Sequence, residues 1–239
     1  RLDSQSRDVS ALTTNDINAV SFCDEPSCDN FGNLATVGCQ VGYMVTNGPT
    51  AKVLKTADGG GSFSGIATPF SNVNHNIVDV KCDGNNVIVV NGQASEYAYS
   101  WDAGVTWTVV TTPTQIMNKA YMLGGTKVWF VGQGGYIYYS TNRGSSVSVQ
   151  DAGNATSQSL NDISAADALT LYAVGDNNAF VITEDGGNIW SAKTGPSVAT
   201  ANDDLYKILA IPGTDVVFIA DEEGNVYRSE DRGDTWTTV

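Results

Sequence analysis

Five carboxylates occur in short segments rich in Gly and Asn that are typical of turns, where a side chain can contact a ligand. They are Glu96, Asp176, Asp221, Glu222 and Glu223, and the tyrosines Tyr43 and Tyr136 stand in comparable turns. Clustered carboxylates can bind calcium, raise the pKa of a neighbouring carboxyl for acid–base work, or attract a basic partner. Each of them can equally be a solvated turn residue that points away from the others, so both interpretations stay open.

The sequence lacks the residues that most other kinds of functional site require. The chain has a single histidine, His75, and contains no HExxH motif, no Cys-x-x-Cys motif and no phosphate-binding Gly-Lys-Ser/Thr loop. Zinc sites and nucleotide chemistry need those groups. We therefore expect no catalytic residues, no metal site and no cofactor, with calcium at the carboxylates as the one alternative.

The charge of the chain limits its partners further. The net charge is −14, from 26 acidic against 12 basic side chains. Binding to nucleic acid or to an anionic membrane surface needs clustered cations, and insertion into a membrane needs a long apolar stretch that this sequence lacks. Basic proteins, metal ions and neutral glycans remain possible ligands, or the acidity serves only to keep the protein soluble.

A repeated sequence segment indicates which elements position these residues. Five eight-residue segments share one pattern, and their third residues lie 40 to 46 residues apart. The segments are "TADGGGSF", "SWDAGVTW", "STNRGSSV", "TEDGGNIW" and "SEDRGDTW", with Asp58, Asp102, Asn142, Asp185 and Asp231 at the third position. A period of this length indicates one supersecondary unit per repeat.

The repeated segment has a mechanical interpretation. Asp, Ser and Thr side chains hydrogen-bond nearby backbone amides and fix a tight turn, and Gly supplies a residue with positive φ. The closing aromatic residue, such as Trp107, Trp190 or Trp236, begins the next strand and buries a large apolar face. Each segment is therefore expected to be a structural staple between two antiparallel strands, and not a site.

These segments resemble the Asp-box, or BNR, repeat of sialidases, sortilin-type receptors and photosystem II assembly factors. The resemblance implies an all-β fold, a β-propeller in which the box joins the third and fourth strands of each four-stranded blade. We predict five blades, at about 17–67, 77–110, 118–150, 160–193 and 204–239, after an N-terminal arm or closing strand over 1–16. The sequence leaves open whether five blades close alone or belong to a larger ring.

In a propeller the turns opposite the boxes converge on the mouth of a central channel. The seven turn residues named first are therefore the expected binding site. The blade-one turn is expected within "VGYMVTNGPTA", which carries Tyr43.

The cysteines, at positions 23, 28, 39 and 82, are expected to form disulfides. A local Cys23–Cys28 bond and a Cys39–Cys82 bond between strands are both feasible, but the connectivity stays open.

The resemblance to sialidases does not extend to their activity. It would imply three arginines around a substrate carboxylate, but Arg143 and Arg232 lie within boxes and Arg228 lies just before one. We therefore expect a non-enzymatic structural or binding propeller of an extracellular, periplasmic or virion surface, such as a virion decoration protein, a filament subunit or a cell-surface module. It would bind protein partners or itself as a homo-oligomer. The alternative is a propeller that binds or hydrolyses glycans at the acidic mouth.

Overall fold

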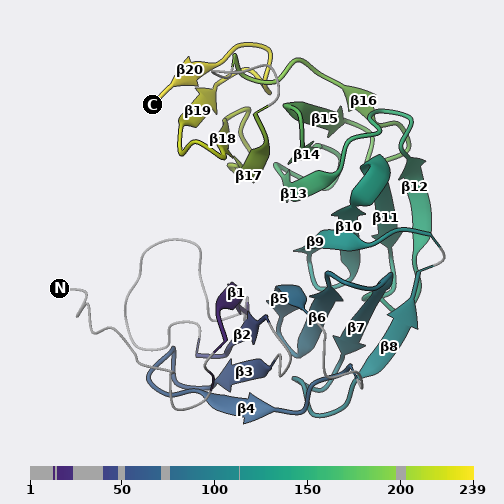
Figure 1. Cartoon of the computed structure of the whole chain (residues 1–239), viewed down its shortest axis with the longest axis vertical. Coiled ribbons are helices and arrows are strands. Elements are labelled where there is room, and N and C mark those ends of the chain that lie inside the picture. The colour runs from purple at the N-terminus through teal and green to yellow at the C-terminus, as the bar shows by residue number, and fades with distance from the viewer. Residues whose placement is uncertain are drawn as a thin grey trace. The chain divides into compact units, whose positions relative to one another are not determined.

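The computed structural model describes residues 13, 15–23, 40–47, 52–70, 76–112, 114–197 and 203–239. Their strands form five four-stranded sheets, and in each sheet every strand pairs antiparallel with the next one along the chain (Figure 1). This is the predicted β-propeller with five blades, and every box joins the third and fourth strands of its blade as expected. None of the described residues forms a helix long and apolar enough to cross a membrane.

The chain divides into two compact units, residues 1–112 and 113–239. The first unit holds two blades. Blade one consists of β1 (Ile17–Phe22), β2 (Gly42–Thr46), β3 (Val53–Thr56) and β4 (Ser64–Ile66), and blade two of β5 (Ile77–Asp83), β6 (Asn86–Asn91), β7 (Glu96–Ser100) and β8 (Thr108–Thr111).

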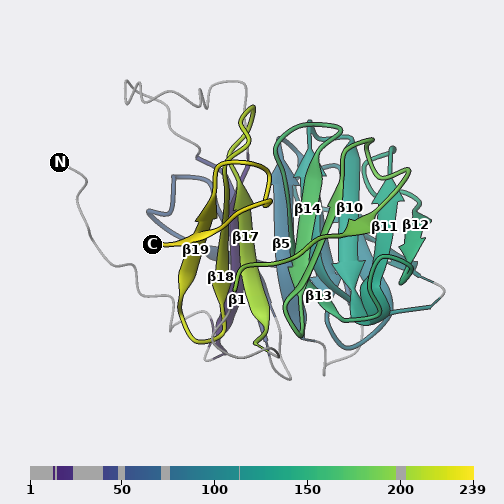
Figure 2. The same cartoon turned by 90° about the horizontal axis from the view of Figure 1, so that it is seen from above.

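The second unit holds three blades, whose turns lie at the two ends of the strands in the side view of Figure 2. Blade three consists of β9 (Met117–Leu123), β10 (Lys127–Gly132), β11 (Tyr136–Ser140) and β12 (Ser148–Ala152), with the 3-10 turn η1 (Gln133–Gly135) before β11. Blade four consists of β13 (Leu160–Ala165), β14 (Leu171–Gly175), β15 (Ala179–Thr183) and β16 (Ser191–Ala192). Blade five consists of β17 (Leu205–Ala210), β18 (Val217–Asp221), β19 (Val226–Ser229) and β20 (Thr237–Thr238).

Burial explains why the middle strands of the blades read as continuous apolar runs. Every residue of β14 and of β15 is buried, because both faces of the sheet are covered. The outermost strands β8, β16 and β20 are largely exposed.

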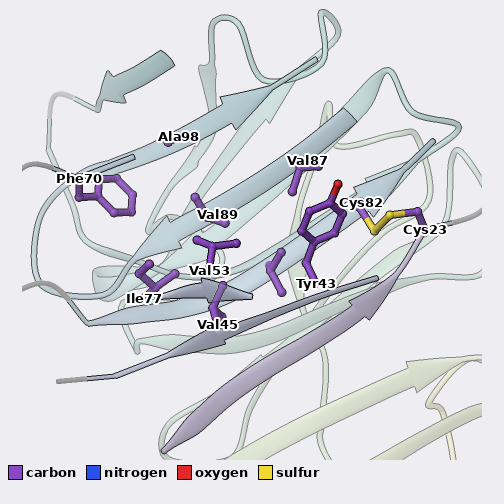
Figure 3. Packing of buried hydrophobic residues seen from close by; sticks show 11 residues of the cluster. Cys23, Tyr43, Val45, Val53, Phe70, Ile77, Cys82, Val87, Val89 and Ala98 are labelled. Atoms are coloured by element: carbon purple, nitrogen blue, oxygen red, sulfur yellow. A yellow bond between two sulfur atoms is a disulfide. The ribbon is translucent and has the colours of Figure 1, made fainter. Parts of the chain in front are cut away.

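The core of the first unit joins its two blades around one disulfide. Cys23, just after β1, is bonded to Cys82 in β5. Figure 3 shows Tyr43 and this disulfide within the same buried cluster as Val45, Val87 and Val89.

A bulge lies near the start of every first strand, and in three blades it links the blade to the next one. The register of that strand shifts at its second residue in all five sheets. Three of these bulged residues are asparagines that donate to the first carbonyl of the next blade's first strand, namely Asn18 to Ile77 (2.9 Å), Asn118 to Leu160 (2.8 Å) and Asn161 to Leu205 (3.3 Å). A bulge re-aims a side chain out of its own sheet, which suits this bridging role.

One sequence-based expectation about blade one is corrected, and one open question is settled. The stretch 41–51, expected to hold the turn of blade one, contains its second strand, because β2 covers Gly42–Thr46. Pairing of Cys82 with Cys39 is excluded because Cys82 is bonded to Cys23, which also excludes a Cys23–Cys28 bond. Cys28, Cys39, His75 and nearly all of the expected arm over 1–16 lie outside the described residues.

Candidate functional site

The boxes form five nearly identical turns. The first residue, Ser or Thr, donates its hydroxyl to the Asp or Asn two positions on, at 2.7 to 2.8 Å in all five turns. The same hydroxyl accepts from the amide of the fifth residue, a glycine, at 2.7 to 2.9 Å. The carboxylate or amide oxygen of the third residue then accepts from the amide of the seventh, at 2.8 to 3.0 Å.

These hydrogen bonds stabilise the ionised form of the box aspartates. Hydrogen bonds from the Thr106 side chain and amide, and from Ser100, lower the pKa of Asp102 to about 2, and the equivalent bonds lower that of Asp231 to about 2. The pKa of Asp185 is lowered too, chiefly by the amide of Ile189.

The fourth residue of a box presents its carbonyl to the preceding blade. Its φ is positive even where it is not glycine, as in Ala103 (58°) and Arg232 (60°). The carbonyl of Ala103 accepts from the Tyr43 hydroxyl at 3.0 Å and from Lys55 Nζ at 2.8 Å.

The second unit repeats this link with other side chains. The carbonyl of Gly186 accepts from Gln150 Nε2 at 3.1 Å, and that of Arg232 accepts from Lys193 Nζ at 2.7 Å. Gln150 and Lys193 occupy the same place, three residues after the last residue of their own box. A box therefore also anchors the blade before it.

The predicted acidic residues of the second unit lie in hydrogen-bonded turns. Asp176 accepts from Asn161 Nδ2 at 2.8 Å, Glu222 accepts from the amide of Asp204 at 3.3 Å, and Glu223 is exposed. Asp221 is buried and accepts from the Tyr227 hydroxyl and from Asn225 Nδ2, both at 2.8 Å. Burial opposes ionisation of Asp221, but these hydrogen bonds outweigh it and lower its pKa.

The other three predicted residues have different surroundings. Tyr136 is half-buried, with its ring centroid 5.9 Å from that of Tyr138. Glu96 belongs to the first unit, where it accepts from Asn91 Nδ2 at 2.7 Å. The prediction that Tyr43 is a binding residue is corrected, because its side chain is fully buried. Its hydroxyl donates to the box of blade two, and Tyr43 lies at the end of β2 away from the β2–β3 turn.

The acidic residues thus serve local structure first. Among the residues that the structure describes, no three His, Cys, Asp or Glu side chains are arranged to hold a metal ion. Calcium binding and ligand binding at these turns stay predictions.

A groove that the sequence did not indicate lies between blades three and four. Its volume is about 510 Å³. One wall is the outer strand of blade three and the residues beside it, and the other is box four with the β13–β14 turn; they comprise Lys127, Tyr139, Ser148, Val149, Gln150, Ala168, Leu169, Asp185, Gly186, Gly187 and Asn188. Gln150 links the two walls, because it donates to the carbonyl of Gly186 at 3.1 Å and accepts from Trp190 Nε1 at 3.4 Å.

Lys127 gives the groove a cation of its own. In the described part of the second unit, Lys193, Arg228 and Arg232 all lie within 4 Å of carboxylates, whereas Lys127 and Arg143 do not. The amide of Arg143 donates to the carbonyl of Thr126 at 2.9 Å, which holds Arg143 beside Lys127. Two exposed apolar residues, Val149 in β12 and Leu169 in the β13–β14 turn, complete the walls.

Comparison with known proteins connects this unit to one family. The model of the family described as photosynthesis system II assembly factor YCF48 matches residues 111–230, half of the chain. A search of curated proteins found no significant match.

Solved structures of low identity share the fold. "YCF48 bound to D1 peptide" is 16% identical with a TM-score of 0.68, over 94% of this chain and 68% of that one. YCF48 from Cyanidioschyzon merolae is 17% identical with a TM-score of 0.61, over 84% of this chain and 69% of that one. The GH74 xyloglucanase from Xanthomonas campestris is 14% identical with a TM-score of 0.67, over 93% of this chain but only 38% of the enzyme.

These findings confirm the Asp-box propeller resemblance and correct two other expectations. The role as a structural protein of a virion, filament or cell surface is wrong, because the matched family is one of photosystem II assembly factors. The extracellular, periplasmic or virion location is wrong for the same reason. The YCF48 structure holds a peptide, which supports a protein partner, whereas neither a glycan ligand nor a surface assembly is shown for this chain.

Proposed function

We propose, from the premise that this chain belongs to the family of the photosystem II assembly factor YCF48, that it is a non-enzymatic propeller that binds a peptide segment of a partner protein during assembly of a complex. The observation that carries the proposal is the match over 111–230, which covers most of blades three to five. The similar YCF48 structure bound to a D1 peptide supports the choice of a peptide as ligand.

The state of the carboxylates supports a binding role over catalysis. A glycosidase needs two carboxylates free to exchange protons and suitably spaced across a substrate. In the second unit Asp221 is held by three donors and Asp185 by its box, and both have lowered pKa values where a general acid needs a raised one. The likeness to the xyloglucanase is one of fold and carries no activity with it.

The test is a calorimetric titration of the full chain with the D1 peptide, beside a scrambled peptide of the same composition. We expect saturable binding of the first and none of the second. In parallel, the chain is incubated with xyloglucan and the release of reducing ends is measured.

Each outcome decides something. Saturable binding without hydrolysis supports the proposal. Equal heats from the two peptides mean that sequence is not recognised, and release of reducing ends would replace the proposal with a glycoside hydrolase.

A further inference from the structure

The groove between blades three and four runs along the edge of a strand. Ser148, Val149 and Gln150 are consecutive residues of β12, and all three line it. Side chains of consecutive residues in a strand point to opposite faces, so a surface that meets all three lies at the edge of the strand. That edge pairs with no strand of its own sheet, because β12 is outermost in the order β12-β11-β10-β9.

β12 is also the longest outer strand of its unit. It has five residues, whereas β16 and β20 have two each. An unpaired edge of this length presents backbone donors and acceptors to an incoming extended chain, and short edges are the usual means of avoiding this. In the described part of the second unit, strand addition is therefore favoured at β12.

The charge beside this edge selects the ligand. The chain is acidic overall, yet Lys127 in the groove and Arg143 beside it have no carboxylate within 4 Å among the described residues. Box four contributes Asp185, but its carboxylate accepts from the Thr183 hydroxyl at 2.8 Å and from the amide of Ile189 at 3.0 Å. Asp185 stays ionised, but it forms no ion pair within 4 Å with Lys127 or Arg143, so these cations can bind a carboxylate from a partner.

The walls add an apolar contact next to the cation. Leu169 is 57% exposed and Val149 is 45% exposed, although both are large aliphatic side chains. The fourth box turn is closed by its own hydrogen bonds and does not depend on these two side chains. They can pack against an aliphatic side chain of a bound segment.

We infer that this groove is the peptide site: an extended segment adds to the β12 edge, sets a carboxylate on Lys127 and packs an aliphatic side chain between Val149 and Leu169. This inference rests on the proposed function for the identity of the partner, but its chemistry stands on the groove alone. The carboxylate is that of an Asp or Glu side chain or of a C-terminus, and the experiment separates the two.

The test uses blocked pentapeptide probes and the full chain. Acetyl-Val-Thr-Leu-Glu-Val-amide is titrated into the protein up to millimolar concentration, while the backbone amide NMR signals of the protein are followed. The titration is repeated with the peptide that carries Gln in place of Glu, once as the amide and once with a free C-terminal carboxylate. We expect shifts in β12 and around Leu169, and binding weaker by on the order of tenfold for the Gln peptide, as for loss of one charge-assisted contact. Tighter binding of a free-acid Gln peptide would assign the carboxylate to a C-terminus.

Two variants and one control locate the site. Lys127→Glu and Leu169→Ser should each weaken binding of the Glu peptide, by about tenfold or more for the charge reversal. Arg228→Glu changes the net charge equally at an exposed pair with Glu230 and should leave binding unchanged.

The possible results separate the two proposals. If the pentapeptide shifts no signals in β12, or if Lys127→Glu binds as the wild type does, the groove is not the site. If the groove binds the pentapeptide but the chain does not bind the D1 peptide, the groove is a peptide site and the proposed partner is wrong.

Discussion

At the scale of single residues, the hydroxyl that opens each box is the centre of its turn. Ser229 is buried, donates to Asp231 at 2.7 Å and accepts from the amide of Gly233 at 2.7 Å. Ser229→Ala leaves that buried amide without an acceptor, and we expect a loss of about 1–3 kcal/mol of unfolding free energy. Urea denaturation measures it, with exposed Glu230→Ala as the neighbouring control; equal stabilities of the two variants would refute the role of the hydroxyl.

The box aspartates make the unfolding free energy of the protein depend on pH. Asp102 has a folded pKa of about 2 against an ordinary value of 3.8, so its stabilising effect is complete above about pH 4 and disappears as the pH falls towards 2. Asn142 shows that an amide can fill the third position of a box, donating to Ser146 at 3.0 Å. We therefore expect Asp102→Asn to be less stable than the wild type at pH 7, with the difference shrinking at pH 3. A constant difference across that range, measured by urea denaturation, would contradict this account.

The residue types of the boxes were predictable because the sequence repeats them. The sequence did not show that Tyr43 belongs to the core, because the stretch that holds β2 was assigned to a turn. Lys127 and Leu169 were missed as well, since a lone cation and a lone aliphatic residue near turns carry no pattern. One signal was available: Leu169 is an aliphatic residue in a turn between Asp167 and β14.

At the scale of elements, contacts between a box and the preceding blade hold neighbouring sheets together. Gly187 has φ of 92°, and a Cβ there would collide with the Gln150 side chain. Gly187→Ala is expected to cost about 1–3 kcal/mol from the backbone conformation alone. Adding Gln150→Ala should recover part of the total loss by removing the collision. A double-mutant cycle on unfolding free energies measures this coupling, and strict additivity would mean that the two residues do not press on each other.

The disulfide makes a separate contribution within the first unit. Cys23 and Cys82 are 59 residues apart, and closing a loop of that length limits the unfolded chain by about 4 kcal/mol in the chain-entropy account. We expect the Cys23→Ser, Cys82→Ser double variant to unfold at lower urea with little change in the second unit. Proteolysis that cuts both units equally early would contradict a local effect.

The strands could be predicted from the sequence where their signals are local, but contacts between blades could not. The antiparallel strands around each box follow from alternation and turn residues, which are local. The bulges that aim Asn18, Asn118 and Asn161 at the next blade depend on the partner strand, so spacing alone does not show them.

At the scale of the whole molecule, the acidic composition concealed the binding chemistry. A net charge of −14 gives no sign that some cations have no acidic partner. The distribution matters more than the sum, because Lys193, Arg228 and Arg232 lie within 4 Å of carboxylates while Lys127 and Arg143, also in the described part of the second unit, do not. Peptide binding through such a contact should weaken as salt is added, which calorimetry at rising ionic strength would detect.

The most direct test of peptide binding by this propeller is hydrogen–deuterium exchange of the full chain with and without the D1 peptide. We predict slower exchange in β12, at Leu169 and from Asp185 to Asn188, with the acidic turns at Asp176 and Asp221 unchanged. Slower exchange only at those acidic turns would move the site to them, and no change anywhere at saturating peptide would contradict peptide binding itself.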